Sequence, residues 1–287
     1  MGKKKSSKIG KWALRIALAL VALLLVCSAV YFLFFTRITL VADSTFLQVY
    51  PSSDIWKLRV DYASRGTRLR VLKLADSSFD SPDRFKAAVS KARGKAVVLS
   101  PIASEYCIQE KIDVSALLEK SVVLGIHSYS SNKCFDCTLV PNERSGWMDA
   151  ATSLEAETSK MSQNVALVYD SGDIAYIEDI VMCFPEGHVS EFKRQSSSSL
   201  FQTMTLSAMD EQGIVFAMCP YVSSFHRFFI SSTTVQWIID YRFVSVVPKS
   251  NLYGLVTPDF KSIPGIAKNV EKGSRSMESL AYIYVKK

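Results

Sequence analysis

Apolar runs and amphipathic stretches alternate along most of this 287-residue chain. Short runs rich in β-branched residues predict strands, and segments with helical spacing of apolar residues separate several of them. The predicted strands are Arg37–Val41, Arg68–Leu74, Ala96–Leu99, Ser121–Ile126, Thr138–Val140, Asn164–Tyr169, Gly213–Met218, Thr233–Ile239 and Leu252–Thr257. The clearest predicted helices are Ser53–Ser64, Pro82–Arg93, Val114–Glu119 and Ser145–Met161. Because helix-length connections separate the strands, we predict an α/β fold with a mostly parallel sheet and right-handed connections.

One apolar run is long enough to cross a membrane. Ile16–Phe35 contains 20 residues without a charge. As a helix this run spans about 30 Å, the thickness of a hydrocarbon core. It continues through aromatic residues without the small-residue cleavage site of a signal peptide, so we predict an uncleaved transmembrane anchor. Val26 stands before Cys27 where a lipoprotein signal has a small residue, which argues against lipidation.

The basic charge of the chain is concentrated before this run. The formal net charge is +7, yet six Lys and Arg residues precede Ile16 and no acidic residue occurs before Asp43. The rest of the chain is nearly neutral, so its charge gives no reason to expect a nucleic-acid partner. Because only Arg37 closely follows the run, the positive-inside rule predicts a single-pass protein of the cytoplasmic membrane. Its N-terminus would lie in the cytoplasm and its bulk in the periplasm or an equivalent exterior space.

Five cysteines lie in the part predicted to be exported, and two of them have the spacing of a redox motif, Cys134-Phe-Asp-Cys137. The motif follows a polar loop and does not open an obvious helix. Buried thiols or one local disulfide are therefore favoured over a catalytic dithiol. His127 alone does not complete a zinc site with these cysteines. We expect no metal and no cofactor.

Signatures of catalysis are absent from the sequence. It contains no G-x-S-x-G elbow, no P-loop, no G-x-G-x-x-G and no H-E-x-x-H, and its three histidines are dispersed. Residues of a catalytic triad meet in space and not along the chain, so this observation alone does not decide the matter. A binding function is nevertheless favoured over an enzyme.

Three stretches carry a family resemblance: Val71–Tyr106, Ala116–Ser128 and Leu139–Asp173. Their matching elements are Asp76, Ser100-Pro101, His127-Ser128, Asn142, and Gly146 with Ala150. In this order they resemble the type I periplasmic binding proteins, the sugar-binding and LacI-like group. The resemblance implies two α/β lobes with parallel sheets, here preceded by one transmembrane helix. The expected division is a basic tail and anchor over 1–36, a first lobe over 37–142, and a second lobe over 143–287 with return crossings to the first.

The chain departs from this family where sugar-binding members usually clamp their ligand. His127-Ser128 stands in place of Asp-Arg, and Cys219-Pro220-Tyr221 stands in place of Asn-Asp. Either the ligand is different or the cleft has lost its ligand.

In open parallel sheets, ligands bind beyond the carboxyl ends of the strands. Polar groups at those ends can bind solute hydroxyls, and aromatic rings can stack on a sugar or planar ring. The candidate ligand-binding residues are Phe46, Asp76, Ser77, Ser100, His127, Ser128, Asp170, Tyr221, Asp240 and Arg242. Each also has a structural interpretation: the serine and aspartates as strand ends, turns or helix caps, the histidine as a satisfied buried group, and the aromatic residues as core.

We therefore predict a membrane-anchored solute-binding protein that captures a small polar solute, such as a sugar, by hinge closure. It would pass the solute to an ABC permease or report it to a sensor protein. The alternative is a binding-protein fold that has lost its pocket and serves as an interaction or scaffold module in the cell envelope. A thiol oxidoreductase built on Cys134 and Cys137 is a third interpretation.

Overall fold

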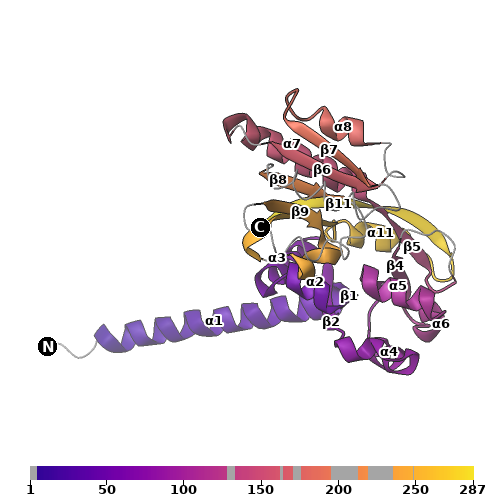
Figure 1. The fold of residues 1–287 in the computed structure, drawn as a ribbon. Coiled ribbons are helices and arrows are strands. Elements are labelled where there is room, and N and C mark those ends of the chain that lie inside the picture. The colour runs from indigo at the N-terminus through magenta and orange to yellow at the C-terminus, as the bar shows by residue number, and fades with distance from the viewer. Residues whose placement is uncertain are drawn as a thin grey trace.

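The computed structural model describes residues 5–127, 133–161, 164–170, 176–194, 213–218, 235–247 and 249–287. A long helix, α1 (Lys5–Phe34), projects from an α/β body (Figure 1). Its stretch Trp12–Tyr31 is long and apolar enough to cross a membrane, with a mean hydropathy of 2.6 and 0% of it buried.

The described strands form one sheet in the order β2-β1-β3-β4-β5-β11-β10-β9-β8-β6-β7. Its first half consists of β1 (Thr36–Ala42), β2 (Thr67–Lys73), β3 (Ala96–Leu99), β4 (Val122–Ile126) and β5 (Cys137–Asn142). Its second half consists of β6 (Val165–Asp170), β7 (Val189–Arg194), β8 (Ile214–Ala217), β9 (Gln236–Asp240) and β10 (Leu252–Pro258). Neighbouring strands within each half are parallel. The predicted α/β fold with a mostly parallel sheet is confirmed.

One long strand, β11 (Ser276–Lys286), joins the two halves. Its first part pairs with β5 in parallel, from Ser276 to Ala281. Its second part, from Tyr282 to Lys286, pairs with β10 in the antiparallel sense. The same strand therefore belongs to both halves.

Helices cover the sheet on both faces (Figure 1). In the first half they are α2 (Ser44–Val49), α3 (Ser52–Ser64), α4 (Pro82–Val89), α5 (Pro101–Gln109), α6 (Val114–Leu117) and α11 (Ile263–Asn269). In the second half they are α7 (Glu143–Met161) and α8 (Ile177–Val181). Short 3-10 helices are η1 (Asp76–Phe79), η4 (Tyr241–Val246) and η5 (Lys249–Asn251). Ser81 caps α4 by accepting from the amide of Arg84, as its position before Pro82 predicts.

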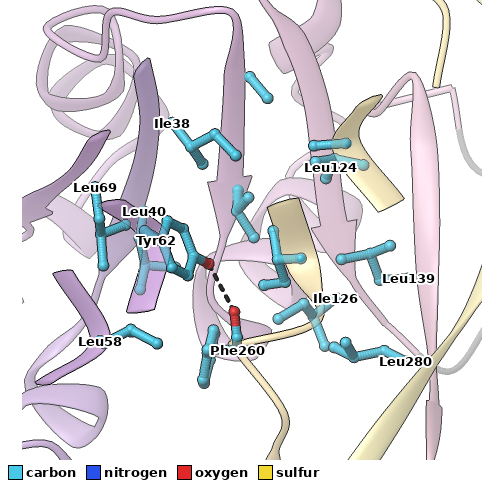
Figure 2. Packing of buried hydrophobic residues seen from close by; sticks show 14 of the residues in the cluster. Ile38, Leu40, Leu58, Tyr62, Leu69, Leu124, Ile126, Leu139, Phe260 and Leu280 are labelled. Carbon is cyan, nitrogen blue, oxygen red and sulfur yellow. Dashed lines mark hydrogen bonds between the residues drawn. The ribbon is translucent and has the colours of Figure 1, made fainter. Parts of the chain in front are cut away.

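The core of the first half lies on both faces of its sheet, so its central strands are almost entirely apolar. Figure 2 shows one face, where Leu58 and Tyr62 of α3 pack over Ile38 and Leu40. The hydroxyl of Tyr62 donates a hydrogen bond of 2.7 Å to the carbonyl of Phe260, in the segment that returns from β10 to α11 (Figure 2). This bond fastens the return segment to the first half.

The crossing from β5 into α7 brings this helix very close to the sheet. A Cβ atom at Gly146 would lie 2.6 Å from Cγ1 of Val256 and 2.9 Å from Cβ of Tyr282. Only glycine permits this approach without a shift of β10 or β11. Ala150, one turn further along α7, is likewise fully buried.

A buried carboxylate fixes the chain just before β11. Asp136, 0% exposed, accepts from the hydroxyl of Ser115 at 2.5 Å, the amides of Val123 and Gly273 at 2.7 Å each, and Nζ of Lys272 at 3.1 Å. Burial alone would raise the pKa of Asp136, but these four hydrogen bonds together hold the pKa below its ordinary value. We call these five residues the Asp136 node. It ties α6, β4 and the start of β11 together.

Candidate functional site

Among the described residues, polar side chains gather at strand ends where the two halves of the sheet meet. In the first half, Asp43 directly follows β1 and is 1% exposed. Its carboxylate caps α2 by accepting from the amide of Phe46 at 2.9 Å. Ser100, which follows β3 and is fully buried, donates its hydroxyl to the other oxygen of Asp43 at 2.5 Å. Ser100 therefore binds a neighbouring carboxylate from within the first half.

A second group lies where the chain crosses from β5 of the first half into α7 of the second half. Asp240, the last residue of β9, accepts from the backbone amide, Nε and Nη2 of Arg242 at 2.8, 2.8 and 2.9 Å. Nη2 of Arg242 also donates to Glu143, the first residue of α7, at 2.8 Å. The side chains of Arg242 and Glu143 are 29% and 31% exposed, so solvent reaches both. The negative charge of Asp240 raises the pKa of Arg242 above its already high value, so the guanidinium keeps its proton.

Two tyrosine hydroxyls lie between these groups. The hydroxyls of Tyr241 and Tyr282 are buried and have no hydrogen-bond partner among the described residues. Burial raises the pKa of both tyrosines, so both stay neutral. Tyr241 follows Asp240 directly and opens η4, which packs against α2, the helix that Asp43 caps. We call the following set the junction cluster: Asp43, Ser100, Glu143, Asp240, Tyr241, Arg242 and Tyr282.

Beside this cluster the halves are joined by apolar contacts. Helix α2 packs against η4, and Val49 of α2 belongs to the apolar cluster on one face of the second half. Tyr50 follows, with its hydroxyl 2.8 Å from Oγ1 of Thr257 in β10. This part of the junction is packed. Such packing favours a body whose halves stay closed over an open binding cleft.

The structure brings only some of the sequence-predicted residues together. Ser100, Asp240 and Arg242 belong to the junction cluster. Phe46 is fully buried in the core, stacked on Tyr50 and edge-on to Phe260, so its ring faces offer no surface for a solute in this arrangement.

The other candidates lie apart from the cluster or outside the described residues. His127 is buried, with its Nε2 2.6 Å from a carboxylate oxygen of Glu105 on α5. Asp76 and Ser77 are exposed at the start of η1, which packs beside α4. Asp170 is the last residue of β6. Ser128 and Tyr221 lie outside the described residues.

Sequence reasoning missed four members of the junction cluster. Asp43 and Glu143 are the first residues after β1 and β5, so the rule that selected Ser100 would also have selected them. Tyr241 follows Asp240, and Tyr282 lies within a strand that the hydrophobic pattern did not predict.

The motif Cys134-Phe-Asp-Cys137 does not form a disulfide. Both side chains are reduced thiols, and they belong to apolar clusters on opposite faces of the sheet. Burial raises the pKa of each thiol, which disfavours the nucleophilic thiolate. Among the described residues no group of three or more His, Cys, Asp or Glu side chains could hold a metal ion.

Comparison with known proteins gives likenesses to solved structures alone. No family model matches the sequence, and no curated protein matches it. A carbohydrate transporter solute-binding protein from Agrobacterium radiobacter in complex with D-arabinose is 14% identical over 88% of this chain and 95% of that chain, with a TM-score of 0.40. An ABC transporter solute-binding protein from Conexibacter woesei is 11% identical over 88% of each chain, with a TM-score of 0.46. A LacI transcriptional regulator from a Rhodococcus species is 11% identical over 87% of this chain and 96% of that chain, with a TM-score of 0.41.

Proposed function

We propose that this protein is a membrane-anchored binding protein that captures a small polar solute, such as a sugar, outside the cytoplasmic membrane. The observation that carries the proposal is the ion pair between Arg242 and Glu143. This pair lies at the carboxyl ends of β5 and β9, one strand from each half of the sheet, beside two buried tyrosine hydroxyls. Carboxyl ends of parallel strands are where open α/β sheets bind ligands.

The chemistry of the junction cluster suits a solute with several hydroxyl groups. Arg242 has guanidinium N–H groups that donate, and Glu143 and Asp240 have carboxylate oxygens that accept. Tyr241 and Tyr282 can do both. A solute that bound both Glu143, which directly follows β5 of the first half, and Arg242 of the second half would favour the closed arrangement of the halves over the open one.

The anchor completes this proposal. In this proposal helix α1 anchors the body at the membrane surface, and the basic residues before the span favour a cytoplasmic N-terminus by the positive-inside rule. A tethered binding protein meets a membrane partner at a high effective concentration. An ABC permease or a sensor protein in the same membrane is the partner that we propose.

Solute binding can be tested on the full-length protein in lipid nanodiscs. Thermal shift against sugars, nucleosides and amino acids should show stabilisation by one class, and calorimetry then gives its affinity. Arg242→Gln should weaken binding by at least about 30-fold, because it leaves Glu143 and Asp240 without their cation. The matched control is Arg144→Gln, which changes the next residue of α7, an exposed arginine paired with Asp179. Equal affinities of the two variants would refute the junction cluster as the site.

The packing of α2 against η4 favours a second candidate function, an interaction or scaffold module whose halves stay closed. In that case no solute in the library stabilises the protein, and crosslinking recovers an envelope partner. Hydrogen exchange of α2 and η4 separates the two functions. Capture predicts that solute slows amide exchange in both elements, whereas a permanently packed junction predicts slow exchange without any solute.

A further inference from the structure

The fold gathers three arginines beside the outer end of α1. Tyr31 is the last residue of the apolar span, and β1 begins at Thr36. Arg37 in β1 and Arg68 in β2 are direct partners in the parallel register. Arg70 lies two residues after Arg68, so its side chain points to the same face of the strand. The sequence shows only Arg37 near the span. Strand β2, which lies beside the end of α1 (Figure 1), adds two more cations, Arg68 and Arg70.

These side chains line one hollow. It has a volume of about 360 Å³ and is bordered by Tyr31, Arg37, Arg68, Leu69 and Arg70. The guanidinium of Arg68 lies over the ring of Tyr31, 5.7 Å from its centroid. Neither Arg37 nor Arg70 forms a salt bridge with an acidic side chain of the described residues. The acidic side chains of the described residues therefore do not neutralise the positive charges of Arg37 and Arg70 in this hollow.

The position of the hollow indicates what would neutralise it. Tyrosine at the end of a membrane span lies at the level of the lipid headgroups. A second hollow, of about 200 Å³, also lies at the amino ends of β1, β2 and β3, and its lining includes Lys95 and Lys268. Cations are thus concentrated at the end of the first half where α1 enters, opposite the carboxyl ends that bear the junction cluster.

We propose that the hollow lined by Arg37, Arg68 and Arg70 binds the phosphate of an anionic phospholipid in the outer leaflet. Guanidinium groups bind phosphate oxygens through paired N–H donors, and several arginines favour an anionic headgroup over a zwitterionic one. The proposal rests on the membrane anchor proposed above. A lipid bound here would attach the edge of the sheet to the bilayer, in addition to the attachment made by α1. Two attachments would fix the tilt of the body.

The test uses full-length protein in nanodiscs of mixed phosphatidylglycerol and phosphatidylcholine, with native mass spectrometry of the lipids that stay bound. The wild-type protein should retain phosphatidylglycerol preferentially. The variant R37Q/R68Q/R70Q should retain at least about fivefold less of it. Arg70→Gln alone changes an exposed residue and should give part of the loss without disturbing the fold, which circular dichroism checks. The control K91Q/K120Q/K249Q removes the same charge from exposed positions outside the hollow and should behave as wild type.

Each outcome decides a separate point. Equal retention by the triple variant and its control would overturn the proposal. Release of phosphatidylglycerol by excess inorganic phosphate would show that the site takes free phosphate and would overturn its assignment to a lipid. Release of the protein from membranes by alkaline carbonate would refute the anchor itself. A protein that stays in the membrane but shows no lipid preference refutes the lipid site and leaves the proposed anchor and solute binding untouched.

Discussion

Replacing Asp136 with asparagine should destabilise the protein strongly. The substitution keeps the shape of the side chain but removes the charge, and it turns one acceptor into an NH2 group that faces existing donors. The amides of Val123 and Gly273 each lie 2.7 Å from an oxygen of Asp136, so one of them would lose its acceptor in a fully buried place. An unsatisfied buried polar group is expensive because it has also lost its water.

The magnitude follows from the partners that remain. Removing one member of a buried ion pair costs about 3–5 kcal/mol. Lys272 is 37% exposed and keeps hydrogen bonds to the carbonyls of Ser115, Leu118 and Ser121, so the lower end of that range applies. We expect Asp136→Asn to lower the free energy of unfolding by about 3 kcal/mol.

The assay is urea unfolding of the full-length protein in mild detergent, followed by circular dichroism. The control is Asp113→Asn in the same region. Asp113 pairs with Arg275 at the surface, where the two side chains are 40% and 39% exposed, and it caps α6 through the amide of Ala116. Asparagine is an equally good cap, so this control should change stability by less than about 0.5 kcal/mol. Equal urea midpoints for the two variants would refute the reasoning about the Asp136 node.

The wild-type protein and the Asp136→Asn variant should differ in how their stability responds to acid. The folded-state pKa of Asp136 lies below its unfolded value. The stabilisation that it gives is therefore complete above about pH 5 and disappears as the pH falls through the folded-state pKa. The difference in unfolding free energy between wild type and Asp136→Asn should shrink over that acid range. A difference that stays constant down to about pH 2 would contradict this assignment.

Four further predictions concern buried groups. Tyr241→Phe removes a hydroxyl that has no partner among the described residues and should leave the unfolding free energy unchanged or raise it by up to about 1 kcal/mol. Tyr62→Phe, which removes the bond to Phe260, should instead lower it by about 1 kcal/mol, so equal urea midpoints would be contrary evidence. Ser100→Ala leaves a buried oxygen of Asp43 without its donor and should lower the unfolding free energy by about 2 kcal/mol; unchanged stability would argue against this pair. Because burial raises the pKa of the Cys134 and Cys137 thiols, iodoacetamide should modify them only in urea, as peptide mass spectrometry would show, and rapid labelling of the folded protein would contradict their burial.

The sequence predicted the central strands well because both faces of the sheet are covered. Ala96–Leu99 is apolar at every position and coincides with β3, all of whose residues are buried. Ser100 does follow the end of this strand, but the pattern predicted no helix at the next residue. Pro101 in fact opens α5 in its first turn, the position that a helix tolerates best. The similar pair Ser81-Pro82 was predicted to begin a helix at Pro82, and α4 does begin there.

The joining strand β11 escaped prediction for a different reason. Its first part carries polar residues, and only Leu280 and Tyr282 face the core strongly. The β-favouring sequence from Tyr282 to Val285 was the available signal. Its pairing with strands from both halves is a property of the assembled sheet, which no local pattern records.

The candidate site was predictable only in part. Ser100, Asp240 and Arg242 were found because each follows a strand. Their actual partners, Asp43 and Glu143, come from strand ends far away in the chain, and the crossing of α7 decides that Glu143 meets Arg242. Phe46 shows the converse: its position near a strand end fits a ligand site, but α2 turns its ring into the core.

Because β11 is hydrogen-bonded to both halves without a break, the halves cannot separate as two bodies on loose linkers. Any opening has to twist this one strand near Ala281 and Tyr282, where its partner changes from β5 to β10. Gly146 places α7 directly against this part of β11, so a larger side chain there would push against β10 and β11. We therefore expect the stiffness of this continuous strand to limit how far the halves can open.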